Sequence, residues 1–379
     1  MAFKIVFTGG GTGGHIYPIV AILREIKKQK PKQTELKMWF LGPNNAPGTE
    51  LLLRENVETK KILSGKWRRY FSLKNIFSPF LTFVGFCQAF LFMLFKAPDL
   101  IFSKGGYGSL PVCLAGKTLG IPIVLHESDA IPGAASKMEA KMAIEIFTSF
   151  PNTPFLQKDK VLCVGNPVRK EIIPPSDAEF KNKAKNKLSL PQTKPVVLFL
   201  GGSQGAKTIN DLVLDLLPDA LHSFCIVHQT GQKHFESVKN EAWATIGDSL
   251  ELKRRYKIYG FLDEQTMPLA LASADMVVAR AGSGTIFEIA ASGKPAFLVP
   301  LPNSAQNHQL KNAYEFKKWG GGEVIEQRNL RPHFLEGMLN HYLKRKDILE
   351  EMSRRSKEFS RPEAARIIAA YLVEFLKVV

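Results

Sequence analysis

The feature that most constrains the fold of this sequence is a pair of matching segments, each an apolar run that ends in a glycine-rich loop. Residues 3–8 lead into the loop 9–14, and residues 196–200 lead into the loop 201–206. Glycine permits the sharp turn that joins a buried strand to a helix, and strand–helix units of this kind build parallel sheets. The sequence therefore predicts an α/β protein with two similar halves.

Further apolar runs alternate with helix-like stretches along the chain. We predict strands over residues 4–8, 38–41, 100–103, 121–126, 196–200, 224–228, 276–279 and 296–299. Most of these runs end in a glycine-bearing or polar loop. Because open parallel sheets bind ligands at the carboxyl ends of their strands, we expect the functional residues in these loops.

The length of 379 residues allows two domains, each large enough to bury its own core. The segment 165–169 and the two prolines that follow it interrupt the pattern of strands and helices. We predict an N-terminal domain over residues 1–168 and a C-terminal domain over residues 169–355. Apolar residues at helical spacing predict an amphipathic helix within residues 356–379, which we expect to pack on the N-terminal domain.

Positive charge is concentrated in the first half. The chain has 51 Lys and Arg against 35 Asp and Glu, and residues 1–170 have 23 against 11, a net charge of +12. This half is expected to face an anionic partner, which could be nucleic acid, a membrane surface or a phosphorylated substrate. The four cysteines form no C-x-x-C pair, so neither a zinc cage nor a disulfide framework is expected, and a reducing cytoplasm fits best.

Residues 76–95 are twenty consecutive uncharged positions that include seven phenylalanines. Basic residues flank this run, at Lys66, Arg68, Arg69, Lys74 and Lys96. The length allows a transmembrane helix, but small residues recur at helical spacing on one side, at Ser78, Thr82, Gly85 and Ala89. We favour a helix that lies on an anionic inner-leaflet membrane through residues 66–96, with its small side on the protein and its phenylalanines toward lipid. A helix buried in the protein core is the alternative.

The glycine loops can bring the backbone close to a phosphate or a sugar at a helix N-terminus. Residues 9–14 satisfy G-x-G-x-x-G, but a dinucleotide site also needs an acidic residue after the second strand, and residues 41–44 supply none. NAD binding is therefore not favoured. A third loop, residues 281–285, precedes Glu288. Thr285 and Glu288 have the spacing of a helix capping box; alternatively, Glu288 accepts hydrogen bonds from both hydroxyls of a ribose.

Six motifs occur in a fixed order. They are GGTGGH at 10–15, KGGYGS at 104–109, HESD at 126–129, GNPVR at 165–169, GGSQGA at 201–206 and the segment 282–288. Together they resemble the MurG family, the N-acetylglucosaminyltransferases that convert lipid I, undecaprenyl-pyrophosphoryl-MurNAc-pentapeptide, into lipid II in peptidoglycan synthesis. The resemblance extends over about residues 3 to 330. It implies the GT-B fold, in which two Rossmann-like, doubly wound parallel-sheet domains face a cleft.

The resemblance also implies roles for individual residues. The C-terminal half would bind UDP-GlcNAc through Arg169, Ser203, Leu262, Ser283, Gly284, Thr285, Glu288 and Gln309, and the opposite half would line the donor with Thr12, Gly13 and Gly14. His15 would be the general base that removes the proton from the 4-hydroxyl of the muramoyl sugar. The family usually has asparagine where this chain has Asp129, which is therefore a sugar contact or a second candidate base.

The chain contains no D-x-D motif, so we expect no metal and no other cofactor. The leaving diphosphate would then be stabilised by helix N-termini, backbone N–H groups and Arg169. We infer a direct displacement with inversion that forms a β-1,4 bond. The resemblance and the basic apolar segment together predict a peripheral enzyme on the cytoplasmic face of the cell membrane.

Two other functions stay open at this point. The chain could transfer a sugar to another lipid acceptor, such as a diacylglycerol, or it could be a non-catalytic module that binds a nucleotide sugar at the membrane. Nucleic-acid binding is not expected, because the basic half has no recognisable helix-turn-helix, zinc-finger or base-stacking motif.

Overall fold

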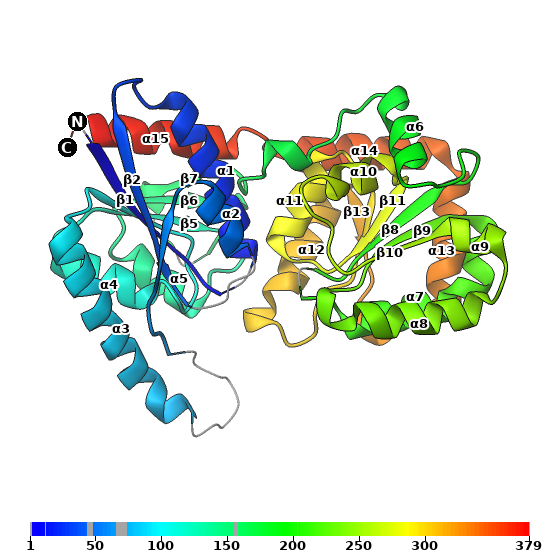
Figure 1. Ribbon diagram of the computed structural model, residues 1–379, viewed down its shortest axis with the longest axis horizontal. Helices are drawn as coiled ribbons and strands as arrows, with labels where there is room; N and C mark the ends of the chain where they lie inside the picture. Colours follow the sequence, from blue (N-terminus) through cyan, green and yellow to red (C-terminus); the bar gives the residue numbers. More distant parts are fainter. Residues whose placement is uncertain are drawn as a thin grey trace. The chain divides into compact units, whose positions relative to one another are not determined.

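The computed structural model describes residues 2–11, 13–43, 48–65, 74–154, 156, 158–202 and 204–378. The chain forms two compact units (Figure 1). Unit 1 contains Met1–Arg169 together with Pro362–Val379, and unit 2 contains Lys170–Arg361. Each unit is built around one parallel sheet, so the predicted α/β class is confirmed.

The sheet of unit 1 has seven strands in the order β3-β2-β1-β4-β5-β6-β7. The strands are β1 Ala2–Thr8, β2 Glu35–Gly42, β3 Glu58–Lys61, β4 Leu100–Ser103, β5 Ile123–Glu127, β6 Glu145–Thr148 and β7 Val161–Cys163. The α-helices are α1 Gly13–Gln29, α2 Thr49–Arg54, α3 Lys74–Lys96, α4 Leu110–Thr118, α5 Ala134–Ala140 and α15 Ala364–Val378. The chain adds β2 and β3 on one side of β1 and then returns to add β4 on the other side. This reversal makes β1 and β4 direct neighbours.

Both faces of this sheet are buried. Phe3, Ile5 and Phe7 of β1 are buried together with residues of α1 and α15, whereas Val6 is buried together with residues of α3, α4 and α5. The helices α1 and α15 lie on one face of the sheet, and α3 and α4 lie on the other (Figure 1). Side chains of a strand alternate between faces. Burial on both faces explains why β1 is an almost continuous apolar run rather than an alternating one.

The last helix completes the core around the first strand. Ile368, Leu372 and Leu376 of α15 are buried together with Ile19 and Leu23 of α1. The two helices lie on the same face of the sheet (Figure 1). The core of unit 1 therefore depends on segments from both ends of the sequence.

The sheet of unit 2 has six strands in the order β10-β9-β8-β11-β12-β13. The strands are β8 Val196–Leu200, β9 Cys225–Gln229, β10 Tyr256–Tyr259, β11 Met276–Ala279, β12 Ala296–Leu298 and β13 Gly322–Val324. The α-helices are α6 Ala178–Lys187, α7 Lys207–Ser223, α8 Phe235–Ile246, α9 Leu250–Arg255, α10 Thr266–Ser273, α11 Ser283–Ala291, α12 His308–Lys318, α13 Pro332–Lys344 and α14 Lys346–Phe359. Here the order reverses between β8 and β11.

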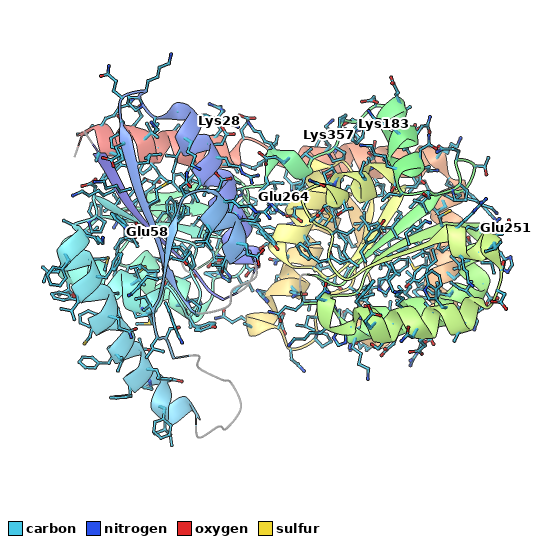
Figure 2. All side chains as sticks on the ribbon, in the orientation of Figure 1. Lys28, Glu58, Lys183, Glu251, Glu264 and Lys357 are labelled. Carbon is cyan, nitrogen blue, oxygen red and sulfur yellow. The ribbon has the colours of Figure 1, made fainter. Side chains whose placement is uncertain are left out.

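All eight predicted strands are present, with bounds that differ from the predicted ones by at most three residues. Five further strands, β3, β6, β7, β10 and β13, were not predicted, and all but β6 lie at a sheet edge. Edge strands tolerate polar residues because one side meets water. In β3 all four residues are exposed, and its Glu58, labelled in Figure 2, accepts a hydrogen bond from Nε1 of Trp39 at 3.1 Å. The sequence of such an edge strand contains no apolar run from which the strand could be predicted.

The small side of α3 packs on the protein, as its spacing predicted. Ser78 and Ala89 are buried. A Cβ at Gly85 would lie 1.7 Å from the carbonyl oxygen of Leu63, so glycine is required at this contact. Thr82 accepts a hydrogen bond from the backbone N–H of Gly65 at 3.2 Å. One side of α3 is therefore fixed to the segment that follows β3.

The other side of α3 is exposed, and its side chains project outward along the helix (Figure 2). The exposed apolar residues are Ile76, Phe77, Phe80, Leu81, Phe83, Leu91, Leu94 and Phe95. By length and composition, Ile76–Lys96 could cross a membrane. The predicted basic flank at Lys66, Arg68 and Arg69 lies outside the described residues, as does the side chain of Lys74.

Replacing Leu372 by alanine is expected to destabilise unit 1 by about 2 to 5 kcal/mol, because a fully buried leucine would leave a cavity. Hydrogen exchange of peptides from β1 and α1 should accelerate in this variant. Glu374→Ala, an exposed change on the same helix, is the control. Equal exchange in the two variants would mean that α15 does not support the core.

Candidate active site

The predicted glycine loops lie at the two points where strand order reverses. In unit 1, residues 9–12 and 104–109 follow the neighbouring strands β1 and β4. In unit 2, residues 201–206 and 280–282 follow β8 and β11. Ligands of open parallel sheets bind where such loops diverge. The topology therefore gives each unit one preferred ligand-binding edge.

His15 lies against both loops of unit 1. A Cβ at Gly106 would lie 3.1 Å from the Cα atom of Gly10 and 3.1 Å from Nε2 of His15. A Cβ at Gly10 would lie 2.8 Å from Cε1 of the same ring. Glycine is thus needed at both positions for the half-buried imidazole to fit at the first turn of α1.

A buried lysine joins three loops at this edge. The Nζ atom of Lys104, just after β4, lies 2.6 Å from Nδ1 of His126, 2.6 Å from Oγ of Ser128 and 3.3 Å from Oδ1 of Asn166. Nε2 of His126 lies 3.0 Å from the carbonyl oxygen of Gly165. Burial lowers the pKa of Lys104 to about 7, against the opposing effect of two nearby carboxylates. His126 therefore orders the loops from inside the protein.

Those carboxylates belong to Glu127 and Asp129. Glu127 is buried, and its Oε1 atom accepts a hydrogen bond from the backbone N–H of Asp129 at 2.9 Å. Burial raises the pKa of Glu127 to about 7, and the negative charge of Asp129 adds to this shift. Asp129 itself is half-buried. The predicted site residue Asp129 thus belongs to a compact group of charged side chains.

Glu139 of α5 is hydrogen-bonded to both ends of the loop 104–109. Its two carboxylate oxygens accept hydrogen bonds from Oγ of Ser103 and Oγ of Ser109, each at 2.6 Å. Ser103 in turn accepts one from the backbone N–H of Gly105 at 3.0 Å. Burial raises the pKa of Glu139 to about 7. This carboxyl group therefore fixes both ends of the loop.

Arg169 is buried, and its guanidinium carbon lies 4.2 Å from the centre of the Tyr17 ring on α1. An arginine in this position makes a cation–π contact. Gly13 and Gly14 form the start of α1, the first buried and the second exposed. The predicted contact Thr12 lies outside the described residues.

In unit 2, helix α11 begins directly after the loop that follows β11. Its N-cap residue is Gly282, and no side chain caps it. The first helical hydrogen bond runs from the N–H of Ile286 to the carbonyl oxygen of Gly282 at 3.0 Å. The N–H groups of Ser283, Gly284 and Thr285 precede this bond, so the helix itself provides no partner for them. They form a site suited to an anion.

The capping-box interpretation of Thr285 and Glu288 is wrong. A capping box needs the threonine at the N-cap, whereas the helix starts at Ser283 and has Gly282 at that position. Thr285 lies in the first turn, and Glu288 is half-buried within the helix.

Gln229, at the end of β9, connects two loops of unit 2. Its Nε2 atom donates to the carbonyl oxygen of Gly202 at 3.1 Å, and its Oε1 atom accepts from the N–H of Leu262 at 2.9 Å. The backbone N–H of Leu262, a predicted contact of UDP-GlcNAc, therefore donates to a side chain in this structure. The predicted contact Ser203 lies outside the described residues.

Gln309 lies in the first turn of α12, next to the loop that follows β12. Its Oε1 atom accepts a hydrogen bond from the N–H of Leu301 at 2.9 Å. Within this loop Gln306 and Asn307 both have φ of 53°, a left-handed conformation that is uncommon outside glycine. This contact uses the amide oxygen of the Gln309 side chain and not its amide nitrogen.

Several residues that build these edges were not predicted as site residues. They are Tyr17, Lys104, Ser128, Glu139, Asn166 and Gln229. Lys104 and Ser128 lie within motifs that the sequence did show, but their contacts join positions far apart in the chain. Only the fold brings these contacts together.

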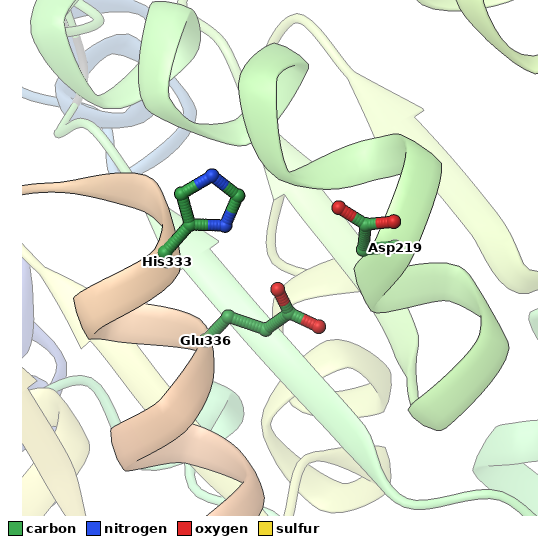
Figure 3. Close-up of side chains that lie close together, drawn as sticks. All are labelled: Asp219, His333 and Glu336. Carbon is green, nitrogen blue, oxygen red and sulfur yellow. The ribbon is translucent and has the colours of Figure 1, made fainter.

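One group of potential metal ligands lies away from these loops. Asp219 of α7 and His333 and Glu336 of α13 have ligand atoms within 4.8 Å of one another (Figure 3). Asp219 and His333 are exposed. This group belongs to neither ligand-binding edge.

Comparison with known proteins bears on both units. The Glycosyltransferase family 28 N-terminal domain matches residues 5–148, and the Glycosyltransferase family 28 C-terminal domain matches residues 196–368. Two relatives, from Treponema denticola and Caldicellulosiruptor saccharolyticus, are 34% and 35% identical to this chain. The alignments cover 98% of this chain and 97% and 98% of the relatives. Both are named UDP-N-acetylglucosamine–N-acetylmuramyl-(pentapeptide) pyrophosphoryl-undecaprenol N-acetylglucosamine transferase.

Among solved structures, the crystal structure of Acinetobacter baumannii MurG is similar, with a TM-score of 0.71 and 23% identity. The match covers 98% of this chain and 99% of that one. The predicted architecture of two parallel-sheet domains of the GT-B kind is thereby confirmed.

Glu139 should make the stability of unit 1 depend on pH. Its pKa is about 7 in the folded protein and 4.5 as a free side chain. A raised pKa contributes stability below the unfolded value, and this contribution is lost as the pH rises through the folded value. Through the ionisation of Glu139, the parent should lose on the order of 1 to 3 kcal/mol of stability between pH 5 and pH 8. Glu139→Gln cannot ionise, so this loss should be absent in the variant. Hydrogen exchange of the β4 and α4 peptides at the two pH values measures this, with Glu171→Gln as an exposed control. An unchanged pH dependence in Glu139→Gln would contradict the assignment.

Proposed function

The chain belongs to the MurG family of glycosyltransferase family 28, and from this premise we propose that it transfers N-acetylglucosamine from UDP-GlcNAc to the 4-hydroxyl of the muramoyl sugar of lipid I. The product is lipid II, a precursor in peptidoglycan synthesis. The relatives that bear the name of this activity match the chain over nearly its whole length, which supports the proposal.

We assign the donor to the ligand-binding edge of unit 2. The N–H groups of Ser283, Gly284 and Thr285 bind the diphosphate, and the carboxylate of Glu288 binds the ribose hydroxyls. The backbone of Leu262 pairs with the uracil, and Gln309 binds hydroxyls of the sugar. Ser203 contacts the uridine and phosphate part, and we assign the same role to Arg169, the last residue of unit 1 before the chain enters unit 2.

The uncapped N-terminus of α11 is the observation that carries this assignment. Three N–H groups point out of a helix that starts at the strand-order reversal, with a glycine rather than a capping side chain before them. Helix N-termini of this kind stabilise negative charge. A nucleoside diphosphate supplies that charge, and it becomes more negative as the sugar leaves.

We assign the lipid-linked acceptor to the ligand-binding edge of unit 1. His15 takes the proton from the acceptor hydroxyl as that oxygen attacks the anomeric carbon of the donor. Asp129 either orients the acceptor sugar or serves as a second base. Thr12, Gly13 and Gly14 contact the donor sugar.

The reaction is a single displacement. One carbon–oxygen bond forms between the acceptor and the anomeric carbon while the bond to the diphosphate breaks, so the configuration inverts and UDP leaves. The dipole of α11 and the guanidinium of Arg169 stabilise the negative charge that develops on the leaving group.

His15→Ala is expected to lower the turnover number by about 10²- to 10⁴-fold, since a positioned base contributes about that much. The KM for UDP-GlcNAc should change little, because the donor is assigned to unit 2. Transfer of radiolabelled GlcNAc to a lipid I analogue measures both, and His222→Ala, an exposed histidine of α7, is the control. Unchanged turnover would remove His15 from the mechanism. Transfer to a diacylglycerol in place of lipid I would contradict the proposed acceptor.

We further propose that the enzyme binds the cytoplasmic face of the cell membrane peripherally through α3. Phe80, Phe83 and Phe95 are exposed by 63%, 62% and 82%, an apolar surface that water disfavours. The opposite side of α3 is held by the protein, which supports a helix lying in the membrane surface rather than crossing it. Basic residues in the segment 66–74 would add attraction to anionic lipid, at about 1 kcal/mol each.

The triple change of Phe80, Phe83 and Phe95 to serine is expected to reduce binding to anionic phospholipid vesicles on the order of ten-fold or more, since each phenylalanine loses apolar area that lipid would bury. Phe90 stays unchanged because it packs against Phe86, with ring centres 5.9 Å apart. Phe334→Ser, an exposed phenylalanine of unit 2, is the control for sedimentation with the vesicles. Equal sedimentation of the triple variant and the parent would contradict a membrane role of α3.

A further inference from the structure

The amine of Lys104 has a complete set of hydrogen-bond acceptors inside the protein. A lysine ammonium has three N–H donors and no acceptor. The three atoms around Nζ are Nδ1 of His126, Oγ of Ser128 and Oδ1 of Asn166, at 2.6, 2.6 and 3.3 Å. His126 lies at the end of β5, Ser128 follows β5 and Asn166 follows β7, while Lys104 itself follows β4. One side chain therefore ties together the ends of three strands.

The tautomer of His126 fits this arrangement. Its Nε2 atom faces the carbonyl oxygen of Gly165, which can only accept, so Nε2 carries the proton. Burial and the neighbouring Lys104 lower the pKa of His126 well below its usual value, so the ring is neutral. Nδ1 then presents a lone pair to the ammonium of Lys104.

A buried ammonium with neutral acceptors alone is costly unless negative charge lies nearby. The carboxylates of Glu127 and Asp129 both act on Lys104 and favour its charged form. The titratable groups around this point are His126 and Glu127 at the end of β5, Asp129 after β5, Glu139 on α5, and His15 on α1. The charge of Lys104 interacts with the carboxyl groups of both Glu127 and Asp129.

We propose that Lys104 is a positioning residue for the acceptor side of the reaction: through its contacts with His126 and Ser128 it holds the segment 126–129 in place, and its ammonium puts a positive charge beside the carboxyl groups of that segment. This inference rests on the proposed function in one respect, the assignment of the acceptor to this edge. Lys104 does not touch the reacting atoms in this scheme. It acts through its hydrogen bond to Ser128 and through its charge interaction with Asp129.

Lys104→Met keeps the length of the side chain and removes its charge. We expect kcat/KM for the lipid I analogue to fall at least ten-fold while the KM for UDP-GlcNAc stays within two-fold. The acidic limb of the pH–rate profile should move to higher pH, because a carboxylate that loses a neighbouring positive charge binds protons more tightly. Lys104→Arg keeps the charge, so its acidic limb should match that of the parent even if its rate is lower. If Lys104→Met does not fold, this comparison of the arginine variant with the parent tests the proposal.

Lys294→Met is the matched control. Lys294 is half-buried, and its Nζ atom donates to two backbone carbonyl oxygens, those of Ala272 and Ala274. These residues precede β11 and β12, whereas the candidate loops of unit 2 follow the strands. A loss of activity that comes only from removing a hydrogen-bonded lysine would appear in both variants, with no shift of the pH profile. That outcome would overturn the proposal.

A direct titration separates this inference from the proposed function. The ¹³C carboxyl signal of Asp129, identified by its loss in Asp129→Asn, is followed against pH in the full-length parent and in Lys104→Met without any substrate. The proposal expects the Asp129 titration to move to higher pH in the variant. An unmoved titration overturns it, whatever the enzyme transfers. A moved titration in a chain that transfers no GlcNAc would support the charge pairing while contradicting the proposed function.

Discussion

Close backbone contact between loops that leave neighbouring strands is the constraint on which both ligand-binding edges depend. In unit 1 a side chain at Gly10 or Gly106 would meet the ring of His15. In unit 2 a Cβ at Gly205 would lie 2.2 Å from the carbonyl oxygen of Thr230, and Gly205 has a φ of 78° that other residues rarely adopt. Glycine thus has a steric role at these points. It lets the loops converge until backbone N–H groups and a single histidine line the edge of the sheet.

The two units are suited to different ligands. Unit 2 offers backbone N–H groups at the start of α11, whose partial charges cannot titrate and suit a diphosphate at any physiological pH. Unit 1 instead collects ionisable side chains, among them Lys104, Glu127 and Glu139, each buried and each with a pKa shifted to about 7. These groups order the loops around His15, to which the proton transfer is assigned. This division suits a transferase in which one substrate leaves as an anion and the other must lose a proton.

The sequence predicted those parts of the fold that depend on local pattern. Buried strands such as β1 and β8 show apolar runs, and the glycine loops after them mark the ligand-binding edges. Edge strands such as β3 were not predicted, because their exposed polar residues follow no apolar period. The capping box at Thr285 failed because residue spacing does not fix where a helix starts. The contacts of Lys104 with Asn166, 62 residues away, could not be predicted, since only the sheet order brings β4 and β7 loops together.

In the proposed donor site, binding of the nucleobase at Leu262 exchanges one hydrogen bond for another rather than adding one. In this structure the N–H of Leu262 already has an acceptor in the side chain of Gln229, which also holds Gly202. A nucleobase that pairs with Leu262 must replace that acceptor, so the net free energy from the pair is small even though an unpaired donor would be costly. Discrimination between bases then depends on what fails to pair, because a base with the wrong edge leaves the donor or its own polar atom unsatisfied. The same side chain keeps the glycine loop in place, so the loop that meets the phosphate side and the backbone that meets the base are positioned by one residue.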